Sequence, residues 1–205
     1  AGNPFGHWDN VFAYKLDNDR SNNTKGLRPY GTITKTAVAT GAELVAYSGF
    51  SANNYLQQPY NPYIQPGSGS FCVIGWYNQN SITPTTEPVL LSIGSLSNAD
   101  KRIQCAIAND NRLILWTHDG TNNTHAATPD LGTEDSNWHQ VIFLRDVSGY
   151  MRIYRDGIEQ SYQTNQSPGT IRNADSTDSV LSIGSPHFAT GRYFEGDMSL
   201  WRFST

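Results

Sequence analysis

Residues 138–157, WHQVIFLRDVSGYMRIYRDG, constrain the fold of this chain more than any other stretch. They place two strand patterns next to each other with a short turn between them. Apolar residues occupy both alternating positions in 139–145, which predicts a strand inside a sheet covered on both sides. Residues 150–155 alternate between apolar and polar, as in a strand with one wet face. Asp156-Gly157 is typical of a two-residue hairpin turn, so this stretch predicts an antiparallel sheet.

Composition extends this prediction to the whole chain. Only 16% of the 205 residues are charged, 12% are aromatic, and glycines and prolines separate many short apolar segments. This balance favours short strands joined by polar turns, and helical patterns are nearly absent. Sandwiches commonly fill about 200 residues as one unit. We therefore expect a single all-β domain over 1–205, and we expect a fragment of a longer chain because the sequence stops just after a strand pattern.

The charge pattern argues against two classes of partner. The formal net charge is only -4, and lysines and arginines are scattered singly along the chain. Proteins that bind nucleic acid gather basic residues on one face, so no nucleic-acid partner is expected. No apolar run is long enough to cross a bilayer as a helix, so we also expect no membrane insertion.

Three parts of the chain carry a family resemblance. A W-H-x-V motif at 138–141 precedes M-R-x-Y-x-D-G at 151–157, and strand patterns at 71–76 and 193–201 accompany them. Together they resemble laminin-G-like domains, which are members of the concanavalin A-like lectin/glucanase jelly rolls. The resemblance covers roughly residues 50–203. It implies an all-β, two-sheet antiparallel jelly-roll sandwich in which the tryptophan and the Asp-Gly pair are structural.

The start of the chain resembles one branch of this family. W-D-N-V at 8–11 leads through an Asp- and Asn-rich turn at 17–23 to Tyr55-Leu56 and then to the strand pattern at 71–76. Laminin-G-like domains of tailed-bacteriophage structural proteins follow the same order. Residues 12–14 depart from the pattern, since Phe, Ala and Tyr stand where Leu or Val is usual.

This resemblance implies a function outside catalysis. It predicts a domain of a bacteriophage tail fibre or related virion appendage, with a bacterial surface polysaccharide as its partner and a homotrimer as its assembly. An extracellular bacterial carbohydrate-binding or adhesion module is the alternative, located at the cell surface instead of in the virion. A glycan-degrading enzyme of the same fold is a second alternative.

The enzyme alternative depends on one partial motif. Retaining glucanases of this fold use E-x-D-x-x-E, in which two carboxylates on one face act as nucleophile and acid/base. Glu195 and Asp197 match its first two acidic positions, but Leu200 replaces the third. The chain also lacks G-x-S-x-G and H-E-x-x-H. We therefore predict no catalytic residue.

Carbohydrate binding needs an exposed aromatic ring that stacks on a sugar, with amides or charged groups beside it for the hydroxyls. Three clusters meet this requirement, and each could equally be core or ordinary loop. The candidate residues are Trp116 with His118, Asp119 and Asn122; His187 with Arg192 and Tyr193; and Tyr77 with Asn78. Residues 118–135 form the longest segment without a strand pattern, which predicts a loop at the functional rim.

The remaining predictions concern metal and core. Relatives in this family bind calcium through carboxylates at loop rims, so the resemblance leaves open whether this chain holds a structural calcium ion, and its site is unknown. The candidate ligands are Asp9, Asp17, Asp19, Asp119, Asp130 and Asp197. Trp76, Trp138 and Trp201 are assigned to the core. Cys72 and Cys105 lie in strand patterns, where a free thiol acts as a small hydrophobe, and a disulfide between them is left open.

Overall fold

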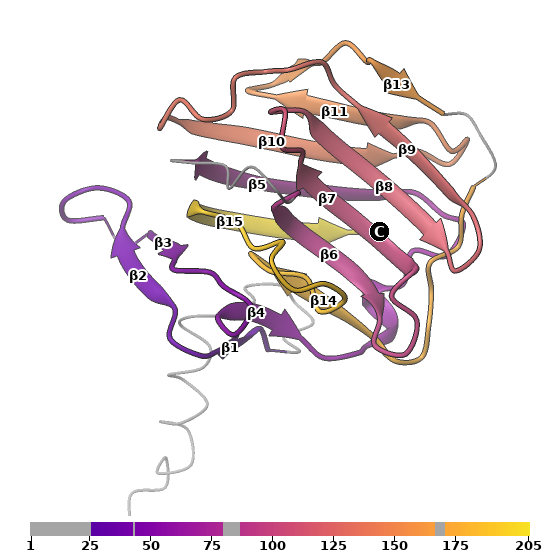
Figure 1. Cartoon of the computed structure of the whole chain (residues 1–205), viewed down its shortest axis with the longest axis horizontal. Coiled ribbons are helices and arrows are strands. Elements are labelled where there is room, and N and C mark those ends of the chain that lie inside the picture. The colour runs from indigo at the N-terminus through magenta and orange to yellow at the C-terminus, as the bar shows by residue number, and fades with distance from the viewer. Residues whose placement is uncertain (1–25, 43, 80–86, 167–170) are drawn as a thin grey trace, which may run out of the picture.

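A computed structural model describes residues 26–42, 44–79, 87–166 and 171–205. These residues form two antiparallel sheets, one of eight strands and one of seven. The sheets lie face to face, with β6 to β9 in front of β5 and β10 in the view of Figure 1. The predicted two-sheet antiparallel sandwich is confirmed. The strand expected near Trp8 falls outside the described residues.

The eight-stranded sheet has the order β1-β4-β14-β6-β7-β8-β9-β13, and the seven-stranded sheet has the order β12-β11-β10-β5-β15-β3-β2. The strands of the first sheet are β1 (Arg28–Tyr30), β4 (Tyr55–Gln58), β6 (Val89–Ser95), β7 (Lys101–Ile107), β8 (Leu113–Asp119), β9 (Asn123–Ala127), β13 (Thr164–Asn165) and β14 (Ser179–Ile183). Those of the second are β2 (Thr34–Ala37), β3 (Val45–Ser48), β5 (Phe71–Gln79), β10 (Trp138–Arg145), β11 (Met151–Arg155), β12 (Ile158–Glu159) and β15 (Gly196–Ser204). A short 3-10 helix, η1 (Pro62–Ile64), follows β4. No helix in the described ranges is long and apolar enough to cross a membrane.

The hairpin expected from the sequence is β10 and β11. Phe143 pairs with Ile153, and both side chains are fully buried in the core between the sheets. The outward residues Ile142 and Leu144 are only half-buried, so the expectation that β10 is covered on both sides is wrong. The seven-stranded sheet therefore has one buried face and one partly wet face.

Strand β9 corrects the prediction of a long loop over 118–135. It runs through the middle of that segment and pairs with β8 along its whole length. Thr124 and Ala126 face inward and are buried. Small and polar residues give a weak hydrophobic alternation, which hid this strand from sequence reasoning.

The core assignment holds for one of the three tryptophans. Trp201 packs on the main core from β15, where it covers Gly75 so closely that a side chain there would collide with its ring. Trp76 and Trp138 are half-buried and lie outside the packed core. On β5 the inward positions belong to Val73, Gly75 and Tyr77. Cys72 and Cys105 are free thiols, half-buried and buried respectively.

Arg145 is a fully buried arginine at the end of β10. Its guanidinium donates to three backbone carbonyls: Nη2 to Gly67 at 2.7 Å and to Gly69 at 2.6 Å, and Nη1 to Arg172 at 3.0 Å. It also lies 4.8 Å from the ring centroid of Phe71. Among the described residues only backbone carbonyls accept hydrogen bonds from the guanidinium, so Arg145 joins two connecting segments to the sheet.

Asp178 ties the end of β6 to the start of β14. Its Oδ1 accepts from the hydroxyls of Ser95 at 2.7 Å and Ser176 at 2.6 Å, and its Oδ2 accepts from the backbone N–H of Ser97 at 2.8 Å. These hydrogen bonds, led by the one from Ser176, hold the pKa of the Asp178 carboxyl well below its usual value. The carboxylate therefore stabilises the fold in its charged form.

Replacing Asp178 by asparagine is expected to remove part of the acid sensitivity of the fold. The folded pKa is lower than the unfolded value of about 3.9, so the stabilisation is complete above that pH and is lost as the pH falls below it. The gap in melting temperature between the wild type and Asp178→Asn should be largest near neutral pH and shrink below about pH 4. Thermal unfolding at several pH values measures this gap, and a gap independent of pH would contradict the assignment.

Candidate functional site

Trp116 lies on the outer face of the eight-stranded sheet. Its neighbour Leu115 belongs to the core, so the Trp116 side chain points the opposite way. Residues paired from strand to strand form one row on this outer face, running from β4 through β14, β6, β7 and β8 to β9. The members of the row are Gln57, Ser182, Ser92, Gln104, Trp116 and His125.

Arg102 connects this row to a second group of residues. Its guanidinium carbon lies 5.9 Å from the ring centroid of Trp116 and 4.6 Å from that of Phe188. Its Nε donates to Gln104 Oε1 at 3.1 Å, and its Nη1 donates to Asp100 Oδ1 at 3.1 Å. Since only 11% of the side chain is exposed, the guanidinium is held in place between the two rings.

Residues 185–192 contribute the second group. His187 Nε2 lies 2.9 Å from the Ser95 carbonyl oxygen at the end of β6. Arg192 Nη1 donates to Glu87 Oε2 at 3.0 Å, and that carboxylate oxygen is also 3.5 Å from the amide nitrogen of Gln104. The structure therefore brings the predicted residues His187 and Arg192 to the same face as Trp116, although they lie far apart in the sequence.

Two polar atoms at the end of the row are buried without a partner among the described residues. They are Trp116 Nε1 and His125 Nδ1, in rings whose centroids are 5.2 Å apart. Burial lowers the pKa of His125, and the nearby Arg112 lowers it further, so the ring is neutral at neutral pH. Buried polar atoms normally find a partner, which for these two would be a water molecule or a ligand.

The other predicted residues of this cluster form a rim at the end of β8. Asp119 Oδ1 accepts from the backbone N–H groups of Thr121 at 2.9 Å and Asn122 at 2.8 Å. These two hydrogen bonds lower the pKa of the Asp119 carboxyl, and the one from Asn122 has the larger effect. Arg172, whose Nη1 lies 3.3 Å from Asp119 Oδ2, lowers this pKa further. His118 Nδ1 accepts from the Gly120 N–H at 3.0 Å. Asp119 and His118 thus shape the turn beside Trp116.

Tyr193 is separated from His187 and Arg192. It lines a hollow of about 360 Å³ at the start of β15, together with Phe50, Glu195 and Asp197. Glu195 and Asp197 are the two carboxylates of the partial glucanase motif. The third position, Leu200, has a φ of 53° and is 52% exposed. A leucine at this position supplies no carboxylate to complete a catalytic pair.

The third predicted cluster is wrong for Tyr77. Its side chain is fully buried, packs edge-on against Phe194, and cannot reach a ligand. Burial also raises the pKa of the Tyr77 hydroxyl. Asn78 is half-buried, and its amide nitrogen donates to the Ser136 carbonyl at 3.1 Å. Both residues lie in the seven-stranded sheet, away from the Trp116 face.

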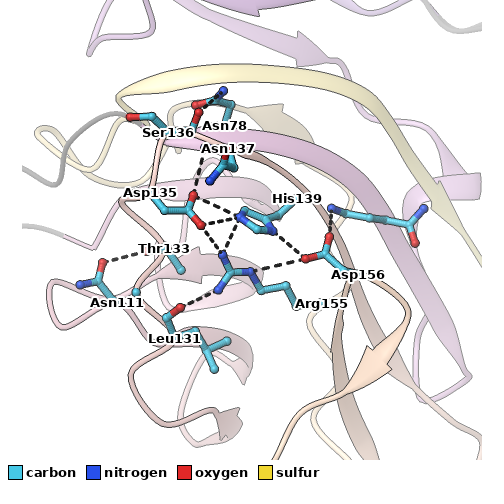
Figure 2. A network of polar contacts seen from close by, with 12 residues as sticks. Asn78, Asn111, Leu131, Thr133, Asp135, Ser136, Asn137, His139, Arg155 and Asp156 are labelled. Atoms are coloured by element: carbon cyan, nitrogen blue, oxygen red, sulfur yellow. Dashed lines mark hydrogen bonds and ion pairs between the residues drawn. The ribbon is translucent and has the colours of Figure 1, made fainter.

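A polar network next to Asn78 explains the motif residues of the family (Figure 2). His139 lies between two carboxylates, with Nδ1 2.6 Å from Asp156 Oδ2 and Nε2 2.9 Å from Asp135 Oδ2. Arg155 Nη1 donates to the Leu131 carbonyl at 2.6 Å, and Asp156 Oδ1 accepts from the backbone N–H of Gln140 at 2.9 Å. The network fixes the segment before β10 to the β10–β11 hairpin, which makes the motif residues His139 and Asp156 structural.

The calcium candidates within the described residues do not converge. Asp9, Asp17 and Asp19 fall outside the described residues, and Asp119, Asp130 and Asp197 lie in different parts of the sandwich. Asp130 Oδ1 accepts from the Gly132 N–H at 2.8 Å in the segment after β9. Within the described ranges, no group of three or more His, Cys, Asp or Glu residues could hold a metal ion.

Sequence reasoning missed the four polar residues Arg102, Gln104, His125 and Glu87. A usable signal existed for the first two. β7 and β8 flank the tight turn at 109–111, and pairing them around this turn places Gln104 opposite Trp116. The places of Glu87 and His125 near Trp116 could not be predicted in this way, because they depend on the order of more distant strands.

Comparison with solved structures supports the fold. The binding domain of Paraclostridial Mosquitocidal Protein 1 matches with a TM-score of 0.66 at 11% identity, over 91% of this chain and 45% of that one. Domains LG4-5 of the mouse laminin alpha1 chain match with a TM-score of 0.53 at 13% identity, over 87% of this chain and 41% of that one. The CBM40 of Ruminococcus gnavus IT-sialidase, bound to alpha2,3 sialyllactose, matches with a TM-score of 0.55 at 14% identity, over 66% of this chain and 75% of that one. This chain spans less than half of the first two, and at these identities the likeness shows the fold alone.

Sequence comparison shows the family. No curated protein sequence matches the chain significantly. A laminin G model, described as the concanavalin A-like lectin/glucanases superfamily, matches residues 50–205. Because this match covers most of the chain, the protein belongs to the concanavalin A-like lectin/glucanase superfamily.

Proposed function

We propose that this protein is a non-catalytic carbohydrate-binding domain that contacts a bacterial surface polysaccharide. The observation that carries the proposal is the outer face around Trp116. A half-buried tryptophan there offers a ring for stacking, and Arg102 and Glu87 stand beside it. Both are held in position by the fully buried Gln104. An apolar ring with a few well-placed polar groups is the usual construction of a small-molecule site.

Two comparisons support a binding role over catalysis. The solved structures with this fold include a toxin binding domain and a carbohydrate-binding module of a sialidase. Leu200 also leaves the glucanase motif of the chain without its third carboxylate. The hollow at Glu195 and Asp197 therefore lacks the carboxylate that the third position of this motif would supply.

We further propose that the domain belongs to a bacteriophage tail fibre or related virion appendage and works there as a homotrimer. The resemblance of the W-D-N-V opening at 8–11 to phage structural proteins supports this placement. Several copies on one fibre would raise the avidity of a weak glycan site.

The test is binding of the purified protein to a panel of bacterial surface polysaccharides, with released reducing ends assayed in the same samples. We expect saturable binding to at least one polysaccharide and no release. Release of reducing ends would overturn the non-catalytic assignment. Absence of binding across the panel would overturn the carbohydrate-binding role.

A further inference from the structure

Two acceptor oxygens on the Trp116 face are already engaged. Glu87 Oε2 accepts from Arg192 Nη1 at 3.0 Å and lies 3.5 Å from the Gln104 amide nitrogen. Gln104 Oε1 accepts from Arg102 Nε at 3.1 Å. These contacts occupy Glu87 Oε2 and one lone pair of Gln104 Oε1.

The donor groups on the same face are in surplus. Trp116 Nε1 is buried and has no acceptor among the described residues. Arg102 donates through Nε and Nη1, the latter to the Ala99 carbonyl at 2.7 Å and to Asp100, but its Nη2 makes no hydrogen bond within the described part of the chain. His118 is the cross-strand partner of Arg102. Its Nδ1 accepts from Gly120, so the hydrogen is on Nε2, which adds a third donor.

We infer that this site selects a glycan with an anionic oxygen group, either a carboxylate or a sulfate or phosphate ester, bound by Arg102 Nη2 and Trp116 Nε1. The inference rests on the proposed function and names the ligand class of that site. The contacts to Gln104, Ala99 and Asp100 fix the guanidinium before the ligand arrives. Hydrogen bonds between ionised partners are about twice as strong as neutral ones, and the low exposure of Arg102 protects them from water.

Matched sugar pairs test the ligand class. The probes are oligosaccharides of a glucuronate-containing polysaccharide, the same oligosaccharides after reduction of their carboxyls to alcohols, dextran sulfate oligosaccharides and unmodified dextran oligosaccharides. The readout is the indole N–H signal of Trp116 in a ¹H–¹⁵N spectrum, identified by its loss in Trp116→Phe. We expect the signal to move with an acidic probe at a concentration about tenfold lower than its neutral partner requires.

The two acidic probes separate a carboxylate ligand from an ester. Equal movement with an acidic probe and its neutral partner would overturn the anionic class and leave the carbohydrate-binding role intact. No movement with any of the four probes would overturn the inference about this site, while the polysaccharide panel decides separately on the proposed function. The four other indole signals report whether the fold is intact.

A charge-removing variant completes the test. Arg102→Gln should lose the preference for the acidic probe, so that the two members of a pair act at nearly equal concentration. Arg152→Gln is the matched control, because Arg152 is a surface arginine paired with Glu159 on the other sheet. It should keep the full preference. A preference unchanged in Arg102→Gln would show that another group reads the charge.

Discussion

Replacing Arg145 by methionine is expected to lower the free energy of unfolding by about 3 kcal/mol, because it leaves the carbonyls of Gly67, Gly69 and Arg172 without their donor. Methionine fills a similar volume, so the loss reports mainly the hydrogen bonds and not a cavity. Burial lowers the pKa of Arg145, yet an arginine stays charged at any ordinary pH. Urea unfolding measures the change from the midpoint and slope.

Two control variants isolate the cause. Arg152→Met removes an arginine whose side chain is 40% exposed, and its ion pair with Glu159 should contribute less than about 1 kcal/mol. Arg145→Lys keeps the charge but replaces the planar fork with a single ammonium group, so its cost should lie between the two. An equal effect of Arg145→Met and Arg152→Met would show that the carbonyl contacts contribute little.

Local pattern was enough to predict an antiparallel β fold and the β10–β11 hairpin, while the two-sheet sandwich was implied by the family resemblance. The alternation in 150–155 and the turn at 146–149 determine β11 and its pairing with β10, and the Asp156-Gly157 turn joins β11 to β12. Side-chain period and turn chemistry act within a few residues. β9 was not predicted from the sequence because threonine and alanine can face a core without a strong apolar signal. Arg145 escaped because an arginine is rarely buried, and its carbonyl partners come from segments remote in sequence.

The direction in which β5 faces shows what a local pattern leaves undetermined. Large apolar residues occupy both of its faces, with Trp76 and Ile74 on one and Tyr77 and Phe71 on the other. Trp201 from the end of the chain packs over Gly75 on the inner face, so Tyr77 is buried beside it and Trp76 points outward. The inward face therefore depends on a residue more than a hundred positions away.

The candidate site shows the same division between local and distant information. Sequence reasoning identified Trp116 and the pair His187 and Arg192 as separate clusters. The two clusters lie on the same face because the sheet order is β14-β6-β7-β8, which places Arg102 between them. Short connections join β6 to β7 and β7 to β8, so local pattern could indicate that part of the order. Neither periodicity nor turn chemistry specifies that β14 pairs with β6, because β14 lies far along the chain.

Replacing Trp116 by alanine is expected to weaken polysaccharide binding by about thirtyfold or more, since a half-buried aromatic ring at the centre of a site commonly contributes 2 kcal/mol or more. The loss should exceed that of Trp116→Phe, which keeps a ring for stacking but removes Nε1. Binding isotherms on a polysaccharide identified by the panel measure both changes. Thermal unfolding of each variant must show an intact fold for the comparison to hold.

The chain provides a matched control for this variant in Trp76. Both tryptophans are half-buried on the outer face of a sheet, but Trp76 lies on the seven-stranded sheet, on the opposite side of the sandwich. Trp76→Ala should therefore cost stability while leaving the binding constant unchanged. If Trp76→Ala abolished binding and Trp116→Ala did not, the glycan site would belong to the seven-stranded sheet. The donor surplus around Arg102 would then have no ligand to explain it.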